Sequence, residues 1–352
     1  MMSARLGPAF PINGPKGPTE GVPVMSHASR RIRYVLKRLL QAVPIVLAIV
    51  ILNFLLLQLA EGDAVDVLAG EAGSATPEYM AELRAKFGLD QPLPVQLAVY
   101  LKNVVMLDLG YSFRHEMPVS ELIFDRLFAT MLLMVSTIIL AVGFGILLGL
   151  IAAMGLNTWR DTVISVFALI TYATPLFWVG LMLIVVFSLN LGWFPTSGME
   201  NFAMFYEGWD RVFDIARHLV LPTITLSLFY LALYTRLMRA SMLEQAGQDY
   251  VTTARAKGVT ERRIMFVHVL RNALLPVVTM AGVQVGALIG GSVIVESVFA
   301  WPGLGMLAFE ALFSRDLNLL LGIFLLSAIL VVAVNLVVDI IYSSLDPRIE
   351  VG

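Results

Sequence analysis

Six long apolar runs constrain most strongly what this chain can fold into. A membrane-spanning helix needs about 20 consecutive, mostly apolar residues. The runs that meet this requirement cover residues of about 36–60, 127–154, 162–190, 217–240, 273–296 and 316–342. None of them alternates between polar and apolar residues as the strands of a membrane barrel do. The sequence therefore predicts an all-α integral membrane protein with six transmembrane helices.

The composition agrees with lipid as the main solvent of the chain. Of the 352 residues, 58% are hydrophobic and 14% are charged, whereas charged residues make up about 25% of an average soluble domain. The chain has no cysteine, which excludes disulfides, thiolate catalysis and cysteine-bound metals. Its four histidines lie far apart in the sequence. We therefore expect neither a metal site nor a cofactor.

The distribution of Lys and Arg predicts how the chain is oriented in the membrane. Basic residues gather in cytoplasmic segments of membrane proteins. About twice as many Lys and Arg residues flank the runs on the side of the N-terminus as on the opposite side. We expect both termini to be cytoplasmic, together with the basic segment 249–276.

Residues 61–125 then lie outside the cytoplasm. Within them, "TPEYMAELRAKFGL" (76–89) predicts a short helix that Thr76 caps and Gly88 ends. "PVQLAVYLKNVVMLDLG" (94–110) predicts a second, amphipathic helix. These signals favour a folded extracytoplasmic helical cap over an unstructured loop.

The segment "DYVTTARAKGVTERRIMFVHVLRNALLP" (249–276) interrupts the apolar runs with a folded, basic stretch. Gly258 suits the end of one helix, and Thr260 can cap a second. A basic interfacial helix could bind anionic lipid. The small side chains at Ala254, Ala256 and Gly258 instead favour close contact with a protein partner.

This segment resembles the cytoplasmic "EAA-type" signature of ABC-importer permeases, in the form found in the dipeptide/oligopeptide family. Gly258, Leu275 and Pro276 match the signature, and of the three positions that give it its name only Ala254 matches literally. The chain also departs from the family at "GDA" (62–64), where "GDP" is common. The resemblance covers residues of about 33–349, and the other stretches that carry it are "FGLDQPLPVQ" (87–96), "GWFPTSG" (192–198), "ESVFAWPGLG" (296–305) and "LDPR" (345–348).

The resemblance implies a B-type permease subunit with the type I ABC importer fold, in the inner membrane of a bacterial cell. It implies several partners besides the lipid bilayer: a second homologous permease, two ATPase subunits and an extracytoplasmic substrate-binding protein. Nucleic acid is not among them, and ATP hydrolysis belongs to the separate ATPases, so the chain itself is not expected to be an enzyme.

In such importers a cytoplasmic coupling helix docks on an ATPase subunit. By residue match, the contact falls on Asp249, Tyr250, Thr253, Ala254, Arg255, Ala256, Lys257 and Gly258. Ala254, Ala256 and Gly258 would permit close approach. Arg255 and Lys257 could pair with acids or carbonyl groups of the ATPase.

The predicted organisation has five parts. Residues 1–28, rich in Gly and Pro, form a disordered extension; we leave open whether residues 1–24 are translated. The other parts are a cytoplasmic anchor with the first helix (29–60), the extracytoplasmic cap (61–125), the core (126–342) and a cytoplasmic tail (343–352). The core includes the coupling segment at about 241–272.

Other positions have two possible roles each. Gly282, Gly286 and Gly290 recur every four residues, a pattern that serves close helix packing or lines a pathway. Glu296, near the end of the fifth run, is either functional or solvated at the interface.

Proline and aromatic residues add two structural expectations. Pro175, inside the third run, predicts a kinked helix. Trp193, Phe194 and Trp301 are expected in the aromatic belt at the membrane surface.

Three classes of function remain to be weighed. A membrane enzyme lacks support, because neither a phosphate-binding loop nor a nucleophile–base or metal motif occurs. An ion-coupled secondary carrier would need ionisable groups within the spans, where charges are scarce. A subunit of an ATP-driven importer fits best. Its substrate stays open: peptides are favoured by the family, with nickel chelates, glutathione and oligosaccharides as alternatives.

Overall fold

The structure is a computed structural model that describes residues 27–59, 76–87, 89–112 and 114–345. The predicted extension 1–28 falls almost wholly outside these residues. The first part of the segment 61–125 and most of the tail 343–352 fall outside them as well.

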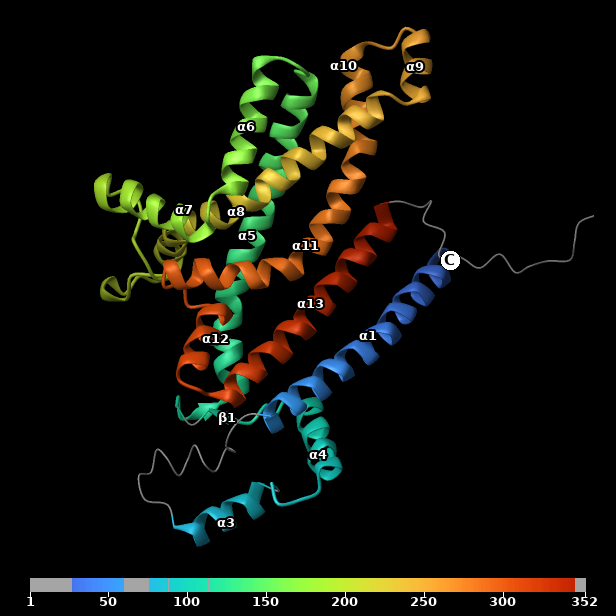
Figure 1. Ribbon diagram of the computed structural model, residues 1–352. Helices are drawn as coiled ribbons and strands as arrows, with labels where there is room; N and C mark the ends of the chain where they lie inside the picture. Colours follow the sequence, from blue (N-terminus) through green and yellow to red (C-terminus); the bar gives the residue numbers. More distant parts are fainter. Residues whose placement is uncertain (1–26, 60–75, 88, 113, 346–352) are drawn as a thin grey trace, which may run out of the picture.

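Helices make up most of the described chain (Figure 1). A single pair of two-residue strands, antiparallel with Tyr111 opposite Pro118, accompanies them in the described part. The elements in chain order are α1 (His27–Leu59), α3 (Pro77–Phe87), α4 (Leu93–Val105), β1 (Tyr111–Ser112), β2 (Met117–Pro118), α5 (Val119–Met154), α6 (Trp159–Ala173), α7 (Leu176–Leu183), the π-helix η1 (Ile184–Asn190), the 3₁₀ turn η2 (Phe202–Met204), α8 (Gly208–Ala246), α9 (Asp249–Ala256), α10 (Glu261–Arg263), the π-helix η3 (Ile264–Val269), α11 (Leu270–Val298), α12 (Leu304–Phe313) and α13 (Leu317–Leu345).

The described residues include 5 helices long and apolar enough to cross a membrane, and up to 6 crossings if α6 and α7–η1 count as one broken span. The prediction of an all-α membrane protein is therefore confirmed. The fifth crossing differs in position from the predicted 273–296. Its apolar stretch is Glu261–Gln284, and Figure 1 shows α11 bending before its end.

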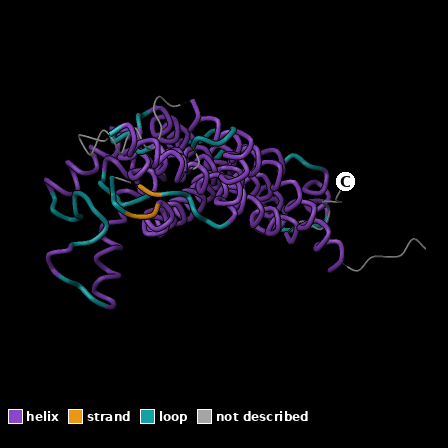
Figure 2. The backbone as a smooth tube through the Cα atoms, turned by 90° about the horizontal axis from the view of Figure 1, so that it is seen from below, coloured by secondary structure: helices purple, strands orange, loops and turns teal. Residues whose placement is uncertain are grey.

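The third predicted crossing is not one kinked helix. α6 and α7 meet at an angle of 103°, so the expected bend at Pro175 is present but is a full break between two helices. The reason is local: Thr174 has an extended backbone with ψ 133°, and Pro175 follows with ψ 131°. The ring of a proline disfavours helical backbone at the residue before it. The segment that follows extends to the side of the bundle (Figures 1 and 2).

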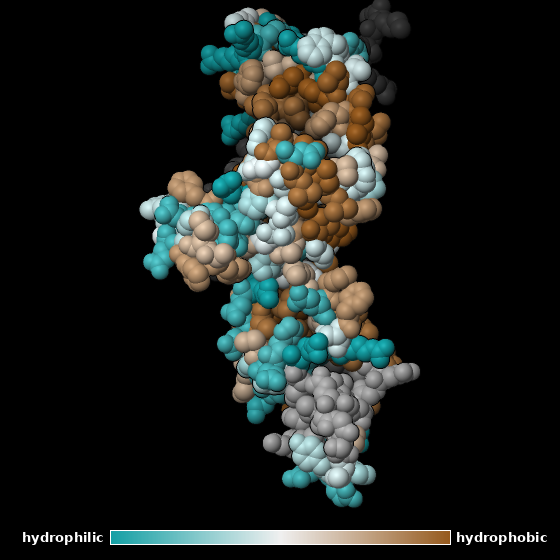
Figure 3. Space-filling model, turned by 90° about the vertical axis from the view of Figure 1, so that its left-hand side faces the viewer, coloured by the Kyte–Doolittle hydropathy of each residue, from teal (hydrophilic) through white to brown (hydrophobic). Residues whose placement is uncertain are grey.

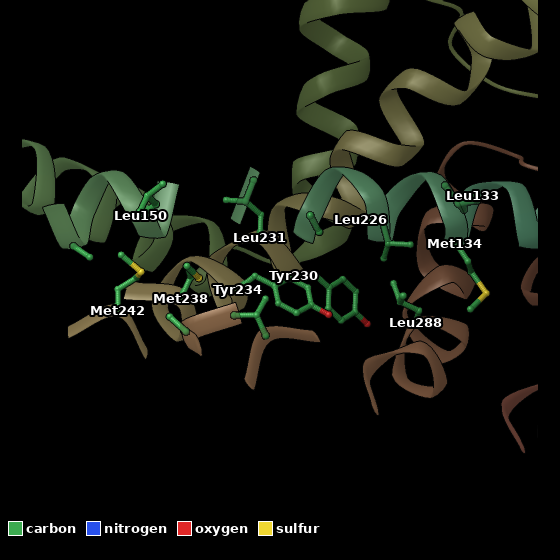
Figure 4. Close-up of a cluster of buried hydrophobic side chains, with 14 of the residues drawn as sticks. Leu133, Met134, Leu150, Leu226, Tyr230, Leu231, Tyr234, Met238, Met242 and Leu288 are labelled. Atoms are coloured by element: carbon green, nitrogen blue, oxygen red, sulfur yellow. The ribbon is translucent and has the colours of Figure 1, made fainter. Parts of the chain in front are cut away.

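The main core lies where α5, α8 and α11 pack together (Figure 4). α5 and α8 approach closely because glycines face the contact. A Cβ added to Gly145 would lie 2.5 Å from the Cβ of Tyr234, and one on Gly149 would lie 2.6 Å from the Cβ of Met238. Small residues permit this close approach of helices in lipid.

A second apolar cluster joins α5, α12 and α13 near the strand pair. Its buried members are Val119, Leu122, Ile123, Leu304, Leu307, Ala311, Leu319 and Ile323. It fixes the short helix α12 between the beginnings of two long helices. The two clusters therefore occupy different regions of the bundle.

α1 lies beside α13, and its Asn53 side chain donates a buried hydrogen bond of 3.1 Å to the carbonyl of Leu321. α4 packs near the end of α1, where the rings of Phe54 and Tyr100 lie 5.8 Å apart. The two short helices predicted for 76–89 and 94–110 are present as α3 and α4.

Large apolar side chains remain exposed on several helices. They include Leu52 of α1, Ile139 of α5 and Leu169 of α6. Figure 3 shows a polar region at the top of the molecule and an apolar surface below it. An exposed apolar surface of this extent suits contact with lipid or with other protein chains.

Candidate functional site

The candidate site is the basic turn between α8 and α11, at one end of the molecule (Figure 1). α8 ends at Ala246, Gly247 follows as its C-cap, and Gln248, with an extended backbone, precedes α9. α9 has 8 residues, and the chain then turns back through α10 and η3 into α11. The predicted helix–turn–helix is therefore present, and two long helices of the core hold it.

Gly258 makes the sharp turn after α9. Its φ of +77° lies in the left-handed region, which glycine adopts without strain. The N–H of Val259 donates to the carbonyl of Ala254 at 3.1 Å, and the N–H of Gly258 donates to the carbonyl of Arg255 at 2.9 Å. This pair of hydrogen bonds defines a Schellman motif and satisfies the last carbonyls of α9.

An apolar inner face ties α9 to the core. Val251 and Ile264 are fully buried members of the main cluster, and the half-buried Ala254 and Val259 pack against it. Tyr250 is also half-buried, and its hydroxyl donates a hydrogen bond of 3.1 Å to Gln245. These contacts keep the short helix in place, although a free peptide of this length would not stay helical.

The outer face of α9 is exposed. Its side chains at Asp249, Thr253, Ala256 and Lys257 point away from the core, and Gly258 is exposed with them. A Cβ built on Gly258 would meet nothing within 4 Å. Of the eight residues predicted to contact the ATPase, Tyr250 and Ala254 therefore face the chain itself, and the other six are exposed.

Arg255 is engaged within the segment. Its Nε donates to Glu261 Oε1 at 2.7 Å, and its second nitrogen donates to Oε2 at 3.2 Å. These hydrogen bonds raise the pKa of the Arg255 guanidinium above its ordinary value. The pair bridges α9 and α10 across the Gly258 turn, so Arg255 does not depend on a partner's acid for a counter-charge.

Thr260 stands at the N-cap position before α10, as its sequence position predicts. Its backbone is extended, but its side chain makes no capping hydrogen bond. Its carbonyl accepts a hydrogen bond of 3.0 Å from the N–H of Ile264. The turn therefore rests on the Schellman motif and the Arg255–Glu261 pair more than on Thr260.

Sequence reasoning missed an ion pair between α6 and α8, in which Asp161 is buried and Arg239 is half-buried. Arg239 donates to both carboxylate oxygens of Asp161, at 2.6 and 2.8 Å. Asp161 also accepts from the backbone N–H of Asn157 at 3.2 Å. The pair holds the start of α6 against the half of α8 that leads into the site. Because 78 residues separate the partners, no local pattern signals the pairing.

The three glycines of α11 lie in different surroundings. Gly282 is buried. A Cβ on Gly286 would lie 3.1 Å from Val331 of α13, whereas one on Gly290 would meet nothing within 4 Å. Close packing against α13 therefore explains why a glycine stands at position 286, but packing within this chain does not explain the glycine at position 290.

Glu296 and Trp301 lie together, at the end of α11 opposite to the candidate site. Both are fully buried. Glu296 is therefore not solvated. The expectation that Trp301 belongs to an aromatic belt was wrong, because its indole N–H donates to the carbonyl of Ala129 inside the protein. Of the other two aromatic residues, Trp193 is exposed and Phe194 packs against the main cluster.

The chemistry of the site is that of a contact surface. Among the described residues, no group of three His, Cys, Asp or Glu side chains could hold a metal ion. The turn offers an exposed helix face with both acidic and basic side chains, on a backbone that the core holds rigidly. Such a surface can bind another protein and transmit its movement to α8 and α11.

Two family models together match most of the chain. The model described as binding-protein-dependent transport system inner membrane component matches residues 145–351. The corresponding N-terminal model matches residues 31–134.

Curated relatives match over nearly their whole length. The chain is 43% identical to the oligopeptide transport system permease protein AppB of Bacillus subtilis, covering 90% of this chain and 99% of the relative. It is 39% identical to the dipeptide transport system permease protein DppB of Escherichia coli, covering 91% and 99%. A putative peptide transport system permease protein of Brucella abortus is 41% identical, with 90% and 98% covered.

A solved structure shares the fold. The inward-facing MetNI methionine ABC transporter matches with a TM-score of 0.51 over 64% of this chain and 96% of the matched chain. At 17% identity, this likeness concerns the arrangement of the helices alone.

Proposed function

The chain belongs to the family of binding-protein-dependent transport system inner membrane components, and from this premise we propose that it is a permease subunit of an ATP-driven peptide importer. Peptides are the proposed substrate class because relatives at 39–43% identity carry the names of peptide, oligopeptide and dipeptide permeases. An ion-coupled carrier is not favoured. Nickel chelates, glutathione and oligosaccharides remain the alternative substrates.

The proposed assembly contains several further components. They are a second homologous permease, two ATPase subunits and a substrate-binding protein on the far side of a bacterial inner membrane. In this arrangement both termini and α9 face the cytoplasm, and α3 and α4 face outward. The excess of Lys and Arg on the side of α9 supports this orientation.

The observation that carries the proposal is that α9 has a buried inner face and an exposed outer face. A coupling element must be accessible to its partner and must also be fixed to the helices that it moves. α9 combines the two properties, since Val251 is fully buried and the side chains of Thr253, Ala256 and Lys257 are exposed. α8 and α11, which flank it, are core helices.

Substitution of Gly258 tests the coupling role. Asparagine tolerates the left-handed backbone better than other non-glycine residues, and the space around the position is open in this chain. Gly258→Asn should therefore insert and fold normally, but its side chain should obstruct an ATPase subunit docked on the turn. We expect peptide uptake and peptide-stimulated ATP hydrolysis to fall steeply in proteoliposomes that hold the complete transporter.

Gly208→Asn is the matched control. Gly208 has a φ of +57° and nothing within 4 Å of an added Cβ, but it lies at the opposite end of α8. This variant should transport at the unsubstituted rate. Equal uptake by the Gly258 and Gly208 variants would refute the coupling role of the α9 turn.

A further inference from the structure

The short helix α12 begins without a capping side chain of its own. Its N-cap residue is Gly303, and no side chain on that residue accepts the first N–H groups. The first N–H groups of a helix have no acceptor within the helix. Water cannot serve here, because Leu304 and Gly305 are buried.

Two other helices supply the missing acceptors. The N–H of Leu304 donates to the hydroxyl of Thr130, from α5, at 2.7 Å. The N–H of Met306 donates to Oε2 of Glu296, from α11, at 3.0 Å. The N–H of Gly305 faces the same carboxyl group. Side chains of α5 and α11 thus serve as the acceptors at the beginning of α12.

The directions of these hydrogen bonds make both carboxyl oxygens of Glu296 acceptors. Since the Thr130 oxygen accepts from Leu304, its own proton is free to go to Oε1 of Glu296, which lies 2.9 Å away. The Ser292 side chain also hydrogen-bonds to the carboxylate. Every group around the carboxyl group is thus a donor, and Glu296 serves as an acceptor at the beginning of α12.

The glycines of the turn leave room for this carboxylate. A Cβ on Gly303 would collide with the carboxyl group of Glu296, and one on Gly305 would lie 2.8 Å from Oε2. Trp301 closes the turn, because its backbone N–H donates to the carbonyl of Glu296 at 2.8 Å. Its indole N–H donates to the carbonyl of Ala129 at 2.9 Å.

We propose that Glu296 is a positioning residue which, together with Thr130, fixes α12 to α5 and α11 so that the three helices move as one body during transport. The stretch "ESVFAWPGLG" is then a unit: Glu296 supplies the cap, and Gly303 and Gly305 make room for it. Only the transport part of this inference rests on the proposed function. The fixation of α12 stands on the hydrogen bonds alone.

Distances between spin labels test the fixation of α12 directly. The chain has no cysteine, so labels can be placed at Phe128→Cys on α5 and Phe313→Cys on α12, both of which are exposed. We expect one narrow distance distribution for the purified full-length chain in lipid nanodiscs. Glu296→Gln places an amide NH₂ against hydrogen-bond donors, and Thr130→Val removes the hydroxyl. Each of these should broaden the distribution.

Two variants serve as controls for this measurement. Thr130→Ser keeps the hydroxyl and should restore the narrow distribution. Ser297→Ala changes the next residue along α11, which is exposed and hydrogen-bonds within its own helix, and it should have no effect. A narrow distribution in both Glu296→Gln and Thr130→Val would overturn the inference.

Uptake kinetics test whether the fixation matters for transport. We expect Glu296→Gln and Thr130→Val to lower the maximal rate of peptide uptake while the half-saturating peptide concentration stays unchanged, and Thr130→Ser to restore the rate. An unchanged maximal rate in the two disruptive variants would overturn the transport part. The distance measurement needs no transport, so it would still decide whether α12 is fixed if the proposed function failed.

Discussion

The two turns that flank the long helix α11 use glycine in opposite ways. Gly258, before α11, has a left-handed backbone and nothing within 4 Å of an added Cβ. Gly303, after α11, has an extended backbone that other residues can adopt, but an added Cβ would collide with Glu296. The first turn needs glycine for its conformation and the second needs it for space.

This difference indicates that the two turns have different roles. The turn at Gly303 is completed within the chain, because Thr130 and Glu296 satisfy its N–H groups. The turn at Gly258 satisfies its own backbone and leaves an exposed helix face beside it. We interpret the Gly303 turn as internal fixation and the Gly258 turn as a docking surface. Substitutions at the two turns should therefore affect different properties.

The largest expected effect is on stability, at the buried turn. Gly303→Ala forces the Glu296 carboxyl group out of a fully buried site, and overpacking combined with the loss of several buried hydrogen bonds should cost about 3 kcal/mol or more. Thermal unfolding of the purified chain in detergent measures the loss. A melting temperature equal to that of the unsubstituted chain would contradict the account of this turn.

The next effect concerns the anchor of α9. Val251→Ala removes buried methyl groups from the main cluster and should cost about 2 kcal/mol. The loss should appear as faster amide hydrogen exchange in residues 249–258, with little change around α12. Thr252→Ala, an exposed neighbour, is the control. Uniform loosening of the whole chain would show that α9 is not anchored separately.

The smallest effect on stability is expected for the exposed pair of Arg255 and Glu261. Their side chains are 49% and 62% exposed, and exposed ion pairs contribute little to folding. Arg255→Ala should leave the melting temperature unchanged but lower peptide-stimulated ATP hydrolysis, because the bridge orients the docking turn. If Arg255→Ala lowered the melting temperature but kept full peptide-stimulated ATP hydrolysis, the assignment of the Gly258 turn as a docking surface would be contradicted.

The sequence was sufficient for the parts of the fold that depend on local chemistry. Apolar runs of spanning length located the first, second, fourth and sixth crossings, and Gly258 marked the end of α9 because a left-handed turn requires such a residue. The two short helices α3 and α4 also followed from local signals. These features depend on neighbours within a few residues of each other, which a single sequence displays.

Features that depend on distant partners were missed. Trp301 was expected in the aromatic belt at the membrane surface, but a carbonyl on α5, far away in sequence, accepts its indole N–H inside the protein. Asp161 and Arg239 gave no sign of pairing. Pro175 indicated a disturbance of the helix, but the 103° turn follows from two successive extended residues, Thr174 and Pro175.

Site-directed cross-linking tests the central claim, that the outer face of α9 docks on an ATPase subunit. Since the chain has no cysteine, single cysteines can be placed at Thr252, Ala256 or Lys257, which are exposed on the docking turn. The same change at Phe313, exposed at the end of α12, is the control. We expect a short bifunctional reagent to link the three α9 positions to the ATPase in membranes and to leave the Phe313 position unlinked. Absence of a link from α9, or equal linking from Phe313, would contradict the account.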